Sequence, residues 1–154
     1  MKVYLDIETS FSGEITVIGI YYSDGRLIQL IGDEVNCNNL LNSLTRTETI
    51  VTYNGSRFDL PIIRNKLGID LTKHYNCYDL MYDCWKCNLY GGLKRVEEQL
   101  GIDRASKGIN GWEAMRLWEN FSKYNDHQAL TTLLQYNRDD VINLVNLEKK
   151  LKDG

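Results

Sequence analysis

The chain has 154 residues, 43% of them hydrophobic, which is enough for one domain with a sizeable core that needs no disulfide or metal support. Its formal net charge of −3 argues against a protein that coats nucleic acid through bulk positive charge. The first residues, MKVYLDIE, contain no apolar run as long as a signal peptide or membrane span. We therefore expect a single domain over residues 1–154 that is soluble and cytoplasmic, with no membrane partner and with reduced cysteines.

The first segment of the chain predicts an antiparallel meander. Strands are expected over residues 2–8, 14–22 and 26–31. The Asp24-Gly25 pair between the last two is typical of a β-hairpin turn. In the first strand, side chains alternate between two faces, so Asp6 and Glu8 lie on the same face and can bind one ion together.

The middle of the chain places an acid at the start of a helix. The expected elements are a short helix, a strand and a second helix, over residues 40–46, 49–53 and 57–67. Asn54-Gly55-Ser56 ends the strand, and Pro61 lies in the first helical turn, where its missing N–H is harmless. Asp59 is therefore expected just beyond a strand end, at a helix N-terminus.

The remaining residues are mostly helical. We expect a fifth strand over residues 75–78, followed by helices over 80–87, 93–100, 112–121 and 126–151. This order of elements predicts an α/β fold with a mixed five-stranded sheet, whose first three strands are antiparallel, flanked by helices.

The last predicted helix distinguishes between two adjacent acids. At about 100° per residue, its leucines and valines form one apolar stripe. Asp139 points away from that stripe. Asp140 falls on its edge, one turn after Tyr136, where an acid borders the core and needs a partner.

Asp6, Glu8, Asp59 and Asp140 thus come from three distant segments, which is a common way to assemble a site for hard divalent cations. Any one of them alone is better explained as a solvated charge, a helix cap or a salt-bridge partner. Their combined order favours a shared metal site and points to phosphodiester chemistry.

These segments resemble the motifs of the DEDD superfamily of 3′-to-5′ exonucleases, which have the ribonuclease H-like fold. The resemblance rests on Asp6-Ile7-Glu8, on the segment from Asn54 to Asp59, and on the segment from Tyr136 to Asp140. The Tyr-x-x-x-Asp spacing marks the tyrosine branch. The segment from Gly92 to Ile102 is also similar to predicted prokaryotic RNase-H-like exonucleases, and the resemblance spans residues 3 to about 147.

The resemblance implies a metal-dependent exonuclease that removes nucleotides from single-stranded 3′ ends of DNA or RNA. Two Mg²⁺ or Mn²⁺ ions about 4 Å apart would activate water and stabilise the leaving oxygen. Asp6 would bridge them, Glu8 and Asp140 would complete the site of the water-activating ion, and Asp59 would act through water on the other. Tyr136 would orient the attacking water, because its ordinary pKa of about 10 keeps it protonated.

Three further residues are candidates for substrate binding. By resemblance, Asn54 and Phe58 would touch the terminal nucleotide, with Phe58 packing against sugar or base. A turn-former and a core aromatic are equally good explanations for these two. Lys94 and its neighbour Arg95 are candidates for phosphate contact, although a solvated helix face explains them as well.

A structural zinc is not expected, although His74, Cys77, Cys84 and Cys87 have the spacing HxxC followed by CxxC. Residues 79–87 read as a continuous helix, and cysteines one turn apart are common without metal.

Two other functions remain open at this stage. The first is an endonuclease on the same fold that acts like a ribonuclease H or a resolvase, and the second is a non-catalytic nucleic-acid-binding module. The Tyr136 and Asp140 pair favours the exonuclease. The sequence does not separate DNA from RNA or name a protein partner.

Overall fold

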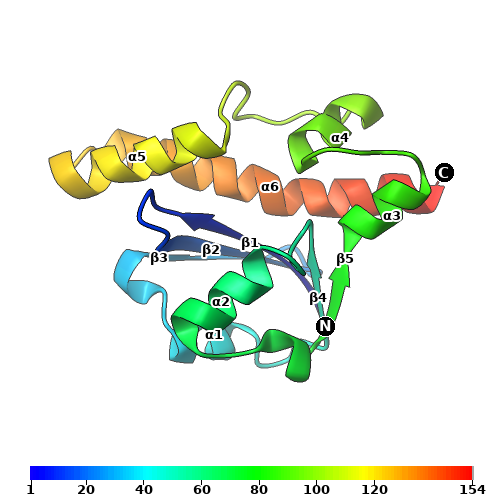
Figure 1. Cartoon of the computed structure of the whole chain (residues 1–154), viewed down its shortest axis with the longest axis horizontal. Coiled ribbons are helices and arrows are strands. Elements are labelled where there is room, and N and C mark those ends of the chain that lie inside the picture. Colours follow the sequence, from blue (N-terminus) through cyan, green and yellow to red (C-terminus); the bar gives the residue numbers. More distant parts are fainter. Residues whose placement is uncertain (154) are drawn as a thin grey trace.

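A five-stranded sheet lies between two layers of helices in the computed structural model, which describes residues 1–153 (Figure 1). The strands are β1 (Lys2–Thr9), β2 (Ile15–Tyr22), β3 (Leu27–Ile31), β4 (Thr49–Thr52) and β5 (Asn76–Asp79), in the spatial order β3-β2-β1-β4-β5. The first three are antiparallel, whereas β4 is parallel to β1 and β5 is parallel to β4. The predicted α/β fold with a mixed sheet is therefore confirmed.

One face of the sheet is covered by α1 (Cys37–Ser43) and α2 (Asp59–Leu67) (Figure 1). Its core contains the apolar residues of β1, namely Val3, Leu5 and Ile7, together with Leu40 of α1 and Ile63 of α2. Helix α1 begins three residues before the expected position, because the side chain of Asn36 accepts a hydrogen bond from Asn39 N and caps it there.

The long helix α6 (His127–Asp153) crosses the other face of the sheet, alongside α3 (Leu80–Lys86), α4 (Leu93–Leu100) and α5 (Gly111–Tyr124) (Figure 1). Tyr4 of β1 packs in this second core with Leu144 and Leu147 of α6. Because side chains alternate along a strand, Asp6 and Glu8 face the same helical layer as Tyr4. Two short 3-10 helices, η1 (Gly32–Glu34) and η2 (Leu71–Lys73), complete the elements of residues 1–153.

The turn before α2 is longer than the sequence indicated, so the helix begins at Asp59 rather than at residue 57. Asn54 adopts a left-handed φ of 60°. Asp79, at the end of β5, accepts hydrogen bonds from the backbone N–H groups of Asn54 and Ser56, and so fixes this turn against the sheet. None of the helices within residues 1–153 combines the length and apolar character needed to cross a membrane.

Candidate metal centre and active site

Three carboxylates meet where β1 passes beneath α6. Asp6 and Glu8 of β1 and Asp140 of α6 each offer an oxygen, and these atoms lie within 4.8 Å of one another. Within residues 1–153, no other group of three or more acidic, histidine or cysteine side chains comes this close. The helical periodicity predicted Asp140 rather than Asp139 for this position, and the group contains Asp140.

Asn137 holds the two strand carboxylates in place. Its Nδ2 lies 3.2 Å from Asp6 O and 3.3 Å from both Asp6 Oδ2 and Glu8 Oε2. Gly19 of β2, which pairs with Asp6, makes room for it, because a Cβ there would lie 2.1 Å from Asn137 Oδ1. The role of Asn137 was missed from the sequence, although it lies three positions before Asp140 and hence on the same side of the helix.

Asp59 approaches the group from the opposite layer of helices. It is 3% exposed, and its Oδ2 accepts a hydrogen bond of 3.0 Å from Ile7 N, the residue between the two strand acids. Its place in the first turn of α2 also favours a negative charge.

Burial and neighbouring negative charge raise the pKa values of Asp6, Glu8 and Asp59. Burial, reinforced by the charge of Asp140, raises the pKa of Glu8 to about 8. Burial and the charges of Asp140, Glu8 and Asp59 raise the pKa of Asp6 well above its ordinary range, and burial raises that of Asp59 to about 7. A group of hard oxygen donors whose negative charge is only partly compensated by nearby cations fits a divalent cation such as Mg²⁺ or Mn²⁺.

Tyr136 lies against this group, 2% exposed, with a cation on its ring from each of two other segments. Lys94 Nζ lies 4.4 Å from the ring centroid and the guanidinium carbon of Arg104 lies 5.5 Å from it. Burial and the negative charges of Asp140, Glu8 and Asp6 raise the pKa of Tyr136 above its ordinary value. The phenol is therefore protonated at neutral pH and can donate a hydrogen bond.

Asp139 is buried, although its side chain points away from the apolar stripe of α6. It is 8% exposed and accepts hydrogen bonds from the backbone and hydroxyl of Ser106 and from Gln135 Nε2. The loop between α4 and α5 covers Asp139. The helical periodicity of α6 could not predict this burial, because it depends on another segment of the chain.

A pocket of about 470 Å³ opens onto the carboxylates. Its lining includes Asp6, Asp59 and Asp140 together with all three candidates for substrate binding, which are Asn54, Phe58 and Lys94. Phe58 is 44% exposed, so it is not a core aromatic. Arg95 is not among the lining residues.

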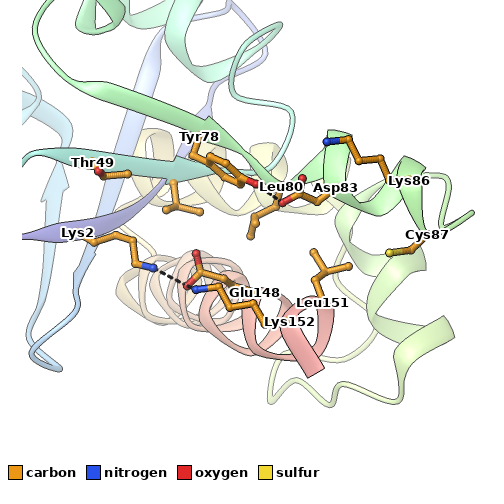
Figure 2. Close-up of a pocket in the computed structure, with 11 residues that line it drawn as sticks. Lys2, Thr49, Tyr78, Leu80, Asp83, Lys86, Cys87, Glu148, Leu151 and Lys152 are labelled. Carbon is orange, nitrogen blue, oxygen red and sulfur yellow. Dashed lines mark hydrogen bonds and ion pairs between the residues drawn. The ribbon is translucent and has the colours of Figure 1, made fainter. Parts of the chain in front are cut away.

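A second hollow of about 470 Å³ lies elsewhere on the α6 layer, between the start of β1 and the end of α6 (Figure 2). Lys2 reaches Glu148 across it, and Leu80 and Leu151 form part of its wall. It contains none of the four predicted acids.

Of the HxxC and CxxC residues, Cys87 lines this hollow and Cys84 is buried within α3.

A model of the RNase H superfamily matches residues 3–152. The chain belongs to the RNase H superfamily. This agrees with the fold expected from the three motifs. Curated protein sequences give no match to the chain.

A solved structure has the same fold. A family B DNA polymerase from the hyperthermophilic archaeon Pyrobaculum calidifontis is 21% identical with a TM-score of 0.77, and the match covers 97% of this chain. The chain spans 24% of the length of that polymerase. The EXD2 exonuclease domain, in a crystal soaked in Mn and GMP, is 20% identical over 99% of this chain and 80% of its own, with a TM-score of 0.43.

Proposed function

We propose that the chain is a metal-dependent 3′-to-5′ exonuclease of the DEDD type, in the tyrosine branch, that acts on single-stranded ends of DNA or RNA. The observation that supports this most directly is the meeting of Asp6, Glu8 and Asp140 within 4.8 Å. Tyr136, one helical turn before Asp140, belongs to the same buried surface.

The four acids are the residues that would hold the cations. When bound, two Mg²⁺ or Mn²⁺ ions supply a more acidic water and stabilise charge on the leaving oxygen. The protein's own contribution is preorganisation: Asn137 fixes the orientation of Asp6 and Glu8, and the Ile7 N–H fixes that of Asp59.

Tyr136 would orient the attacking water. Its raised pKa keeps the phenol protonated, so it would act as a hydrogen-bond donor rather than as a base. The cations on its ring, from Lys94 and Arg104, hold the side chain in position.

The pocket in front of the acids has the size of a small-molecule site and would take the terminal nucleotide. Exposed Phe58 offers a surface for the base or sugar, and Lys94 offers a positive charge for the phosphate. These contacts would recognise an end of the strand rather than its sequence.

The proposal is tested by digesting single strands labelled at the 3′ or the 5′ end, with Mg²⁺ or Mn²⁺. A 3′-to-5′ exonuclease releases labelled mononucleotides from the 3′ label at once and gives a shortening ladder from the 5′ label. Asp6→Ala and Asp140→Ala should both abolish this.

Two outcomes would contradict the proposal. Cutting of a closed single-stranded circle would favour an endonuclease related to ribonuclease H or the resolvases. Absence of both nucleotide release and heat of Mn²⁺ binding would favour a non-catalytic nucleic-acid-binding module.

A further inference from the structure

The loop that joins α4 to α5, residues 101–110, is attached to α6 at three successive points. Asn143 Nδ2 donates to Asp103 O at 3.1 Å, Asp139 accepts from Ser106, and Asp140 accepts from Arg104. Three polar residues on one face of α6 therefore fix the loop directly beside the carboxylate group.

Arg104 is the central element of this attachment. Its Nε lies 2.9 Å from Glu97 Oε1 and its Nη2 lies 2.6 Å from Glu97 Oε2, a bidentate pair with α4. The same Nη2 also donates to Asp140 Oδ1 at 2.7 Å. The side chains of all three residues are less than a tenth exposed.

The network contains more contacts to Arg104 than a structural ion pair requires. Glu97 alone neutralises Arg104, and buried ion pairs are generally weak contributors to stability. Within the described residues, Arg104 Nη1 is buried without a hydrogen-bond partner, so the guanidinium is not in its best-satisfied arrangement. Its orientation instead favours contact with both residues of the third motif, because it also lies against the ring of Tyr136.

We propose that Arg104 is a positioning residue for Asp140 and Tyr136, held in place by Glu97; this rests on the nuclease function proposed above. By bonding Oδ1 of Asp140 it fixes the plane of the carboxylate that meets Asp6 and Glu8. By packing on Tyr136 it keeps the phenol at the edge of the same group. The Glu97 and Arg104 pair thus preorganises the site before a cation arrives.

The test compares Arg104→Gln, Arg104→Lys and Glu97→Gln with wild type. A matched control is Lys107→Gln, which removes an exposed positive charge from the same loop. Mn²⁺ affinity is measured by calorimetry on the folded protein without substrate, and kcat and KM are measured on a 3′-labelled single strand.

We expect Arg104→Gln to weaken Mn²⁺ binding and to lower kcat, each by about 10-fold to 100-fold, as for other residues that orient metal ligands. The KM for the strand should change by less than about 3-fold, since Arg104 does not touch the nucleotide pocket. Arg104→Lys and Glu97→Gln should be intermediate, because each keeps part of the network. Lys107→Gln should behave as wild type.

Three results would overturn the proposal. Wild-type Mn²⁺ affinity and kcat in folded Arg104→Gln would show a purely structural role. Tighter Mn²⁺ binding in that variant would show that Arg104 competes with the cation. An equal loss in Lys107→Gln would show that the charge of the loop, and not its bonded geometry, matters. If wild type releases no nucleotide, the nuclease proposal fails, while the Mn²⁺ titration still decides the role of Arg104.

Discussion

Two buried acids on the same side of α6, about two turns apart, have opposite surroundings. Glu148 receives Lys2 Nζ at 2.8 Å and Tyr4 Oη at 2.6 Å beside the hollow of Figure 2. Burial alone would raise the pKa of Glu148, but these hydrogen bonds hold that pKa below its ordinary value. Asp140 instead faces Asp6 and a Glu8 whose pKa burial and the Asp140 charge raise to about 8.

The difference shows what separates a structural acid from a ligand. At Glu148 the chain supplies its own cations. At the carboxylate group it brings acids together and supplies one buried guanidinium, which contacts only Asp140 among them. The remaining negative charge is a reason for this region to bind a cation from solution.

The largest effect is expected from removing a charge at the carboxylate group. Asp6→Asn should lower nuclease activity by about 10³-fold, because metal-based charge stabilisation is worth several kcal/mol in the transition state. The matched variant Glu148→Gln should retain nearly full kcat. Similar losses in both, measured as kcat on folded protein, would mean that the two acids are not functionally different.

The second effect distinguishes two of the buried tyrosines, Tyr136 and Tyr4. Tyr136→Phe should lower kcat by about 10²-fold, since the hydrogen bond to the attacking water is lost. Its Mn²⁺ affinity should stay within about 2-fold of wild type, because the phenol is not a ligand in this scheme. Tyr4→Phe, which loses only the bond to Glu148, is the control and should leave kcat unchanged.

A third prediction concerns pH and metal. The pKa values of Glu8 and Asp59 are raised to about 8 and about 7 in the folded protein, so between pH 4.5 and 8 the folded state binds more protons than the unfolded chain. The stabilisation that these two acids contribute to the metal-free protein should therefore be fully present at low pH. The free energy of unfolding should fall by about 1 kcal/mol or more as pH rises through this window.

Millimolar Mn²⁺ should reverse that loss, and its stabilising effect in urea unfolding should be larger at pH 8 than at pH 5, where protons compete for the ligands. Equal stabilisation at both pH values would show that the acids with raised pKa values are not the ligands.

The smallest effect is expected at the hollow. Lys2→Met removes a partly exposed ion pair, so stability should fall by about 0.5 to 1 kcal/mol, and the pKa of Glu148 should rise because its main hydrogen-bond donor is gone. Carbon-13 NMR titration of Glu148 measures the pKa directly. A change in Mn²⁺ affinity in this variant would show that the two regions are coupled.

Local sequence predicted the order of strands and helices and the face on which several acids lie, although α1 and α2 begin at other residues than expected. Alternation in β1 placed Asp6 and Glu8 on one face, and the turn after β4 placed Asp59 at a helix start. Periodicity in α6 selected Asp140 over Asp139 for the group. These features follow from the geometry of single elements, which the order of residues specifies directly.

Contacts between elements were decided only by the tertiary structure. Gly19 makes room for Asn137 from a different strand, Ser106 covers Asp139, and Arg104 reaches Asp140 from a loop without periodicity. Each of these contacts depends on which loop or strand packs against α6. The periodicity of a single strand or helix does not predict that packing. The sequence by itself therefore determined the face or element end on which each acid lies, because the geometry of a single strand or helix follows the order of its residues. Only the packing around α6 decided which side chains hold these acids and that Asp139 is bound by Ser106.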